Sequence, residues 1–248
     1  MFIAWKAPWG LLLVLPLAAA LGLAAAALGT GRPDAVLPSP RAGTPLAPMQ
    51  KIAFHFPVDV ETAEVTASPP LEGSVLVKGA SVEFRPVEPM RPGAVYEFFV
   101  TASRGEERFS EAFAYPVMPL ADELWVYARL DRIPHEVFVF RGDQPVRRMT
   151  ASGGRPGYET PEGTFRVQNR GYHFFSQKYG EGAFYWVRIF GNYLFHSIPV
   201  DETGQVIREE AEKLGCPASH GCIRLGFEDA KWFYENVPDG ALVVIDRT

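Results

Sequence analysis

LGCPASHGCIRL, residues 214–225, places His220 two positions before the thiol of Cys222, with Gly221 between them. Glycine lets backbone N–H groups approach a ligand closely, and such groups can bind a developing oxyanion. A cysteine needs a partner base to be a useful nucleophile. His220 is the local candidate, whereas His196, on an expected strand, can meet Cys222 only through the fold. The stretch therefore predicts a cysteine nucleophile with two candidate bases.

Each of these residue types also has an ordinary structural role. A lone cysteine is usually a small buried hydrophobe, and a lone histidine on a strand usually belongs to the core. A zinc site built from the two cysteines, His196 and His220 is chemically allowed, but the Cys-x5-Cys spacing with an internal histidine is not the usual ligand spacing. We therefore expect no metal and no organic cofactor.

Three segments, in chain order, carry a family resemblance. They are GRPGYETPEGTF at residues 154–165, Phe-His-Ser at residues 195–197 and SHGCIRL at residues 219–225. Together they resemble the L,D-transpeptidase family, whose members cross-link bacterial peptidoglycan. Asp229 also fits the family pattern, and the resemblance covers about residues 121–248.

The departures from the family pattern are small. Ser197 stands where many members have glycine, and Cys216 is a thiol that the motif does not require. Cys216 is either a buried side chain or, in an oxidising compartment, a disulfide partner that would silence Cys222. Non-reducing peptide mapping of protein from the envelope distinguishes these two readings.

The resemblance implies a mechanism. Cys222 attacks the carbonyl between the L-centre of diaminopimelate and a terminal D-alanine, and His196, oriented by the Ser197 carbonyl, takes the thiol proton. A thiolate beside an imidazolium is the expected form. The N–H groups of Gly221 and Cys222 bind the oxyanion. An amine of a second stem then attacks the thioester to form a 3→3 cross-link, whereas attack by water gives an L,D-carboxypeptidase.

Other residues receive supporting roles from the same resemblance. His220 shapes the loop or supports the oxyanion site, and Ser219 hydrogen-bonds within the loop beside the substrate. Arg224 either binds a donor carboxylate or braces the loop. Aromatic side chains upstream of His196 line the donor groove or pack in the core: Tyr179, Tyr185 and Trp186. The expected partners are peptidoglycan stem peptides, with carbapenems as acylating agents of Cys222.

Composition supports an exported β protein and excludes other classes. The chain has 248 residues, 47% hydrophobic and 21% charged, which suits two small folded domains. Its 29 acidic against 24 basic residues give no electrostatic reason to expect nucleic-acid binding. Two cysteines cannot form a disulfide framework or a four-cysteine zinc site.

The N-terminal segment sets the expected compartment. An uncharged apolar run from Pro8 to Gly29 follows Lys6 and is long enough to cross a bilayer. We expect residues 1–29 to be a signal anchor, with a cleaved signal peptide as the alternative. Both readings export the rest of the chain to the cell envelope, membrane-anchored or secreted. Residues 30–48, rich in proline and alanine, are expected to be an extended spacer.

The remaining sequence predicts two mainly β domains. Residues 49–118 contain short alternating strands and turns, as at 51–56, and resemble bacterial Ig-like β-sandwich modules. Residues 121–248 are expected to form the β-rich catalytic domain. Short helices are predicted there over 207–214, with a Glu209–Lys213 pair, and over 227–237.

Two functions from other classes compete with this interpretation. One is a catalytically silent peptidoglycan-binding protein, which the intact His196 and Cys222 pair disfavours. The other is a papain-like peptidase, in which the histidine lies far downstream of the cysteine. Here His196 precedes Cys222, so that order disfavours it.

Overall fold

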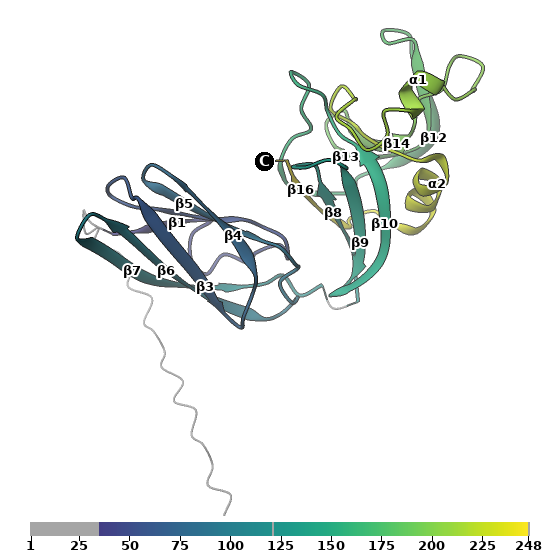
Figure 1. The fold of residues 1–248 in the computed structure, drawn as a ribbon. Coiled ribbons are helices and arrows are strands. Elements are labelled where there is room, and N and C mark those ends of the chain that lie inside the picture. Colours follow the sequence, from purple (N-terminus) through teal and green to yellow (C-terminus); the bar gives the residue numbers. More distant parts are fainter. Residues whose placement is uncertain (1–34, 121, 248) are drawn as a thin grey trace, which may run out of the picture. The chain divides into compact units, whose positions relative to one another are not determined.

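The computed structural model describes residues 35–120 and 122–247. The expected signal anchor, residues 1–29, lies outside the described residues. Among the residues that are described, no helix is long and apolar enough to cross a membrane. Strands dominate the architecture, as the sequence predicted (Figure 1).

The first β region consists of two sheets. A four-stranded sheet has the order β1-β2-β5-β4, and a three-stranded sheet has the order β3-β6-β7, and neighbouring strands in both sheets are antiparallel. The strands are β1 (Leu37–Ser39), β2 (Ile52–His55), β3 (Thr62–Ser68), β4 (Gly73–Lys78), β5 (Ser81–Pro86), β6 (Val95–Arg104) and β7 (Glu107–Pro116).

Alternating side chains from both sheets form one apolar core. In β2, Ile52 and Phe54 are buried, while His55 is exposed, which confirms the predicted alternation. In β6, Tyr96, Phe98 and their even-numbered neighbours up to Ala102 are buried, while the residues between them face outward. The period-two pattern therefore sets which face of each sheet is covered.

Part of the expected spacer is folded. Residues 37–39 form β1 and pair with β2, and Leu46 is fully buried. The Leu46 N–H donates to the Pro116 carbonyl at 2.9 Å. Proline fixes an extended backbone that suits an edge strand as well as a free linker, so proline content alone did not distinguish the two. Residues 35–48 therefore belong to the first β region.

The second β region contains a nine-stranded sheet of order β11-β16-β8-β9-β10-β15-β14-β13-β12. Two neighbouring pairs are parallel, β16 with β8 and β14 with β15. The strands are β8 (Leu124–Arg129), β9 (Glu136–Arg141), β10 (Gln144–Ser152), β11 (Gly163–Arg166), β12 (Arg170–Ser176), β13 (Glu181–Phe190), β14 (Tyr193–Ser197), β15 (Ile223–Leu225) and β16 (Leu242–Asp246).

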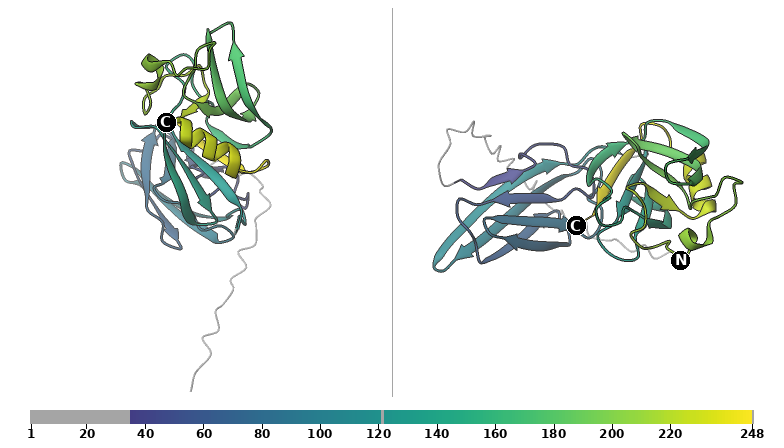
Figure 2. Two further views of the ribbon diagram at one scale, coloured as in Figure 1. Left: turned by 90° about the vertical axis from the view of Figure 1, so that its right-hand side faces the viewer. Right: turned by 90° about the horizontal axis from the view of Figure 1, so that it is seen from above.

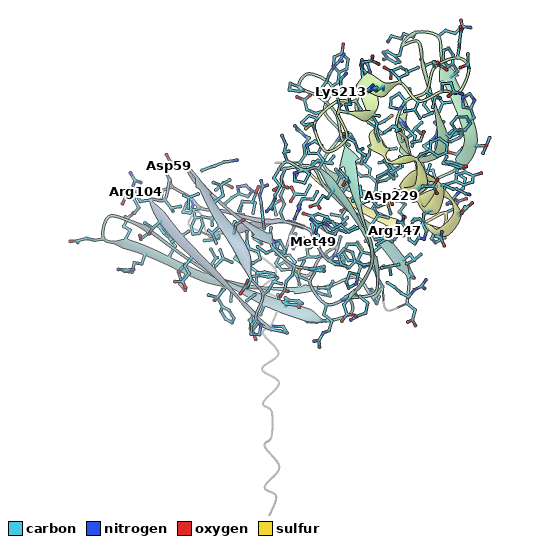
Figure 3. All side chains as sticks on the ribbon, turned by 45° about the vertical axis from the view of Figure 1, so that its right-hand side comes forward. Met49, Asp59, Arg104, Arg147, Lys213 and Asp229 are labelled. Carbon is cyan, nitrogen blue, oxygen red and sulfur yellow. The ribbon has the colours of Figure 1, made fainter. Side chains whose placement is uncertain are left out.

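Helix α2 (Phe227–Asn236) packs against β13 and β14, beside the sheet in both views of Figure 2. Helical periodicity over residues 227–237 predicts one apolar face, and the buried side chains of Ala230 and Phe233 confirm it. Asp229 on its other side pairs with Arg147 of β10 at 2.6 Å (Figure 3), so its role in this structure is to tie the helix to the sheet.

Helix α1 (Arg208–Ala211) is shorter than the predicted 207–214. Glu210 forms an ion pair with Arg224 of the sheet. Lys213 also forms an ion pair with Glu210. The predicted Glu209–Lys213 pair is therefore wrong. The chain leaves the helix through turns that end at Gly215, whose φ of 102° lies in the left-handed region that glycine favours.

Candidate active site

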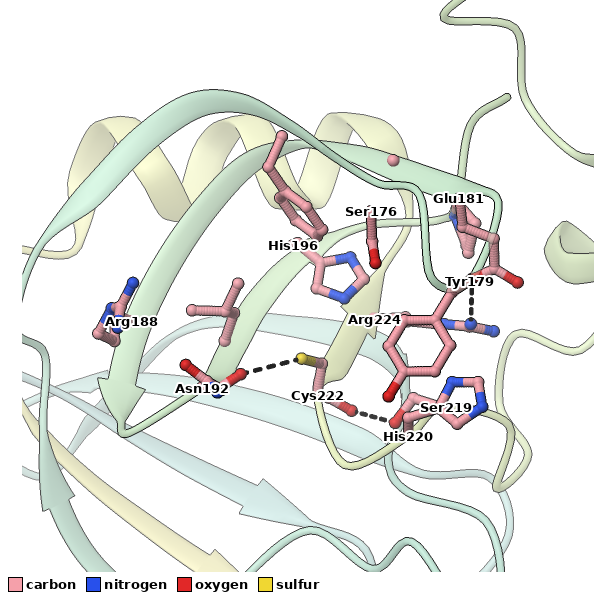
Figure 4. A pocket seen from close by; sticks show the side chains of 14 residues that line it. Ser176, Tyr179, Glu181, Arg188, Asn192, His196, Ser219, His220, Cys222 and Arg224 are labelled. Carbon is pink, nitrogen blue, oxygen red and sulfur yellow. Dashed lines mark hydrogen bonds and ion pairs between the residues drawn. The ribbon is translucent and has the colours of Figure 1, made fainter. Parts of the chain in front are cut away.

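A pocket of about 310 Å³ opens over β13, β14 and the start of β15 (Figure 4). It brings together six of the predicted residues: Tyr179, His196, Ser219, His220, Cys222 and Arg224. Its other lining residues are Phe174, Ser176, Glu181, Gly182, Arg188, Asn192, Leu194 and Pro199. The parallel pairing of β14 with β15 places Phe195 opposite Ile223, and this register brings His196 and Cys222 to one pocket.

The His196 imidazole has a fixed orientation. The ring is buried, and Nδ1 lies 2.6 Å from the Ser197 carbonyl oxygen, which can only accept a hydrogen bond. Nδ1 therefore carries the proton, which leaves Nε2 unprotonated in the neutral ring. The predicted orienting role of the Ser197 carbonyl matches this contact. The Ser197 hydroxyl is buried and accepts from the Phe184 N–H at 3.0 Å, so its side chain supports the strands.

The Cys222 thiol is partly buried at the end of the loop that precedes β15. Its Sγ lies 3.6 Å from the Asn192 carbonyl oxygen, to which the thiol donates. Burial raises the pKa of this thiol, while a hydrogen bond from the Leu194 backbone and the Arg224 charge act in the opposite direction.

These surroundings favour a neutral pair in the free protein. Desolvation lowers the pKa of His196 to about 4; its bond to the Ser197 carbonyl opposes this shift and the Arg224 charge adds to it. With the pKa of Cys222 raised, a thiol and a neutral imidazole are the resting forms near neutral pH. These shifts act against the expected thiolate–imidazolium pair, because burial disfavours both charged forms.

The loop before Cys222 is held by the Ser219 hydroxyl. This buried group accepts from the Gly221 N–H at 2.9 Å and donates to the Cys222 carbonyl at 2.5 Å. The Gly221 N–H is thus engaged within the loop, which corrects the expectation that it faces an oxyanion. Gly221 has a φ of 115°, and an added Cβ would lie 2.6 Å from the Tyr193 ring, so only glycine fits here.

The GRPGYETPEGTF segment clamps the same loop from its other side. The buried Thr160 hydroxyl donates to the Gly221 carbonyl and accepts from the Gly154 N–H, both at 2.9 Å. The Arg155 N–H donates to the Ser219 carbonyl at 3.0 Å. Two sequence motifs about 60 residues apart therefore form one hydrogen-bonded unit around Cys222.

His220 has a different environment from His196. Its Nε2 lies 2.9 Å from an Arg155 nitrogen, and a guanidinium only donates, so Nε2 accepts. The ring stacks on Tyr179, with 4.3 Å between centroids, and meets the edge of Tyr158 at 5.0 Å. Desolvation and the Arg155 charge lower the pKa of His220. These contacts favour a loop-shaping role over that of a base.

Arg224 is enclosed by two acids. One guanidinium nitrogen binds Glu210, and the other lies 3.0 Å from Glu181. The side chain is 4% exposed, and both ion pairs use its terminal nitrogens. Of the two expected roles, bracing the loop fits this geometry and direct binding of a donor carboxylate does not.

The three predicted aromatic residues separate. Tyr179 lines the pocket, whereas Tyr185 packs against Phe227 and Tyr234 of α2, with ring centroids 5.4 and 5.7 Å away. Trp186 covers Gly171 of the neighbouring strand, where an added Cβ would lie 2.4 Å from the indole. Tyr185 and Trp186 are therefore packing residues, and neither lines the pocket.

Cys216 is exposed and unpaired, and it does not line the pocket. The expectation that it is a buried side chain is wrong, because it lies in the surface turns after α1. Within the described residues, no group of three or more His, Cys, Asp or Glu side chains could hold a metal ion.

Sequence reasoning missed Glu181, Arg188 and Asn192. All three lie on β13 or in its turn to β14 and reach the pocket through strand pairing. No local motif marks them. The one signal in the sequence is their position just upstream of the Phe-His-Ser segment.

Fold and pocket together define a β-rich domain with a thiol and an imidazole in one pocket. Residues 125–245 match YkuD, the L,D-transpeptidase catalytic domain. These residues therefore form an L,D-transpeptidase catalytic domain, as the sequence motifs predicted.

Individual relatives agree with this assignment. The chain is 47% identical over 116 residues to the Putative L,D-transpeptidase YciB of Bacillus subtilis (strain 168), a match covering 44% of this chain and 60% of that protein. It is 23% identical over 198 residues to L,D-transpeptidase 2 of Mycobacterium tuberculosis (strain CDC 1551 / Oshkosh). That match covers 75% of this chain and 47% of that protein. The chain thus spans between 47% and 60% of the length of these relatives.

Among solved structures, LD transpeptidase LdtMt1 in complex with imipenem aligns with a TM-score of 0.43 and 19% identity. That alignment covers 86% of this chain and 99% of the other.

Proposed function

We propose that this protein is an L,D-transpeptidase that uses Cys222 to form an acyl-enzyme with peptidoglycan stem peptides. The observation that carries the proposal is the buried His196 ring, which is held by its Nδ1–H and lies in one pocket with the Cys222 thiol. A neutral imidazole with Nε2 free is the form that can accept a proton.

The reaction begins with the thiol of Cys222 turning from the Asn192 carbonyl toward His196. Nε2 takes the thiol proton as sulfur bonds to the carbonyl carbon between the L-centre of diaminopimelate and D-alanine. The Cys222 N–H is the remaining assigned donor to the oxyanion, because the Gly221 N–H is engaged by Ser219. As the C–N bond breaks, the imidazolium returns its proton to the amine of D-alanine, and a thioester remains.

The second half-reaction transfers the acyl group. An amine of another stem attacks the thioester, His196 removes the amine proton, and the thiol leaves protonated. The product is a 3→3 cross-link. Water in place of the amine gives a tripeptide, so the same residues support L,D-carboxypeptidase activity.

The full-length protein, incubated with disaccharide-tetrapeptide, tests this proposal. Mass spectrometry should find D-alanine release that disappears in Cys222→Ala, and the ratio of dimer to tripeptide measures transfer against hydrolysis. A carbapenem should add its mass to Cys222 and block the release. Release that persists in Cys222→Ala, or no release by a folded protein with a reactive thiol, would refute the assignment, and the second result would favour a silent wall-binding protein.

We further propose that the protein works in the cell envelope, anchored by residues 1–29 or secreted after their cleavage, with an Ig-like module at residues 49–118. The apolar run at residues 8–29 supports export, and the two sheets around one core support the module. Deleting residues 31–118 should reduce wall cross-linking in cells. Unchanged cross-linking would contradict a placing role for this segment.

A further inference from the structure

The pocket contains one guanidinium that acids neutralise and one that they do not. Arg224 has Glu181 and Glu210 on its terminal nitrogens. Arg188 lines the same pocket from β13, and no acid in the described part of the chain lies within ion-pair distance of it. Its hydrogen-bond partner is the Gly191 carbonyl, 2.9 Å from one terminal nitrogen.

Arg188 also has unused donor capacity. Its Nε is buried and has no hydrogen-bond partner in the described structure. The guanidinium lies 5.7 Å from the Trp186 ring, which supports one side of the group. A guanidinium offers five N–H donors in a planar fork that matches a carboxylate, so the ligand chemistry that completes Arg188 is a carboxylate.

The turn between β13 and β14 connects Arg188 to the thiol. Arg188 binds the Gly191 carbonyl, and the Cys222 thiol binds the carbonyl of the next residue, Asn192. Consecutive Cα atoms are about 3.8 Å apart, so these two anchors are close. Arg188 also pairs in register with Leu194, whose backbone hydrogen-bonds the Cys222 sulfur. Figure 4 shows Arg188 and Glu181 on opposite sides of Cys222.

The two ends of the pocket therefore differ in charge. At the Glu181 side, the acid and Arg224 neutralise each other, so a substrate carboxylate gains nothing there. At the Arg188 side, the pocket is lined by a guanidinium whose partner is the Gly191 carbonyl and not an acid of the described residues. In the proposed donor, three bonds separate the attacked carbonyl carbon from the carboxylate carbon of the leaving D-amino acid. A donor bound at Cys222 would therefore present that carboxylate close to the attacked bond.

We propose that Arg188 binds the terminal carboxylate of the leaving D-amino acid and makes the pocket selective for donors with a free carboxyl terminus. This inference rests on the proposed function and adds a specificity-determining residue to it. Arg188 thereby takes the carboxylate-binding role that the sequence analysis considered for Arg224.

The test compares two donors in the full-length protein: the disaccharide-tetrapeptide and its D-alaninamide derivative, which lacks the terminal negative charge. Wild type should prefer the free carboxylate roughly 10- to 100-fold in kcat/KM, as a charge-assisted pair implies. Arg188→Gln should lose this preference, mainly through a higher KM for the free acid. Arg188→Lys should keep part of it, because the charge remains without the planar fork.

Two control variants separate this effect from general electrostatics. Lys178 is a cation near Tyr179 but does not itself line the pocket, and Lys178→Gln removes its charge. Arg208→Gln removes a guanidinium whose side chain is 87% exposed. Both should keep the wild-type preference. Alkylation of Cys222 by iodoacetamide, assigned by peptide mass spectrometry, should proceed in every variant, which reports that this thiol is accessible.

The outcomes distinguish the two proposals. A wild-type protein that cleaves both donors equally, or an Arg188→Gln variant that slows both equally, overturns the role of Arg188 while leaving the acyl-transfer function intact. If Arg188→Gln does not fold, the wild-type comparison and Arg188→Lys still decide the matter. No cleavage of either donor by wild type, with Cys222 alkylated normally, refutes the proposed function itself and this inference with it.

Discussion

The two β regions differ in what they bury. All eight buried polar or charged side chains of the described residues lie between positions 135 and 224, and none lies in residues 35–118. They are His135, Glu136, Ser152, Thr160, His196, Ser197, Ser219 and Arg224. Burying a polar group is unfavourable unless it is hydrogen-bonded, so a region that keeps eight of them needs them for positioning.

The partners of these eight groups show what they position. Ser152 contacts the turns after α1, and His135 accepts from the Gly153 N–H at 3.0 Å. Thr160 and Ser219 hold the loop that carries Cys222. The core of the first region is instead filled by aromatic pairs such as Phe84 with Phe98, whose ring centroids are 5.4 Å apart. The first region is therefore organised for stability, and the second for the position of a few functional groups.

Loss of the His196 base should have the largest effect. His196→Gln should lower kcat for D-alanine release by roughly 10²- to 10⁴-fold, because general base catalysis commonly contributes that much. Steady-state kinetics with the tetrapeptide donor measures it. His173→Gln, a change at an exposed histidine of β12, is the matched control. Equal activity of the two variants would show that His196 is not the base.

Removal of a core ring from the first region should act on stability alone. Phe98 is fully buried, so Phe98→Ala should lower the free energy of unfolding by about 3–5 kcal/mol. Denaturant titration measures the loss, and the rate per folded molecule should be unchanged. Phe99 is 41% exposed on the opposite face, and Phe99→Ala should cost far less. A large fall in kcat for folded Phe98→Ala would contradict the division between the regions.

Removal of the Thr160 hydroxyl should lower both the stability of the protein and its catalytic rate. Thr160→Val keeps the shape but leaves the Gly154 N–H and the Gly221 carbonyl without this partner, which should cost about 1–3 kcal/mol of stability. Because the loop holding Cys222 loosens, kcat should fall more than KM rises. Thr164→Val, at an exposed position of β11, is the control. An unchanged kcat in Thr160→Val would mean that the clamp does not position the thiol.

Acidification should destabilise the protein through His196. Its pKa is about 4 in the folded state and about 6.5 in an unfolded chain, so the unfolded state binds more protons between these values. This contribution is complete above pH 6.5 and is lost as the pH falls toward 4. At pH 5 the loss relative to pH 7 should be roughly 1–2 kcal/mol, and it should be absent in His196→Gln.

The same shift should appear in catalysis. The acidic limb of kcat/KM should lie near the lowered pKa of His196, since the neutral ring is the base. A limb near 6.5 would show that the ring is hydrated or charged in the working protein.

Local patterns predicted the frame of the molecule well. Alternation found β2, and helical periodicity found the buried face of α2. Motif resemblance placed His196 and Cys222 correctly in one pocket. Signals of this kind depend on neighbours along the chain, and they are readable before folding.

What depends on distant partners was missed. Strand β3, with the sequence TAEVTAS, has small side chains and little apolar contrast, so no alternation marked it. The engagement of the Gly221 N–H by Ser219 and the enclosure of Arg224 by Glu181 arise from loop geometry and strand pairing. The charge states of Cys222 and His196 follow from burial, which a motif does not report.

The acyl-enzyme itself gives the most direct test of the central claim. Full-length Cys216→Ser protein, in which Cys222 is the remaining cysteine, would be quenched during turnover of the disaccharide-tetrapeptide donor and analysed by peptide mass spectrometry. We predict an adduct with the mass of the donor less D-alanine on the peptide that contains Cys222. Release of D-alanine with no adduct on that peptide, or with the adduct elsewhere, would contradict the account.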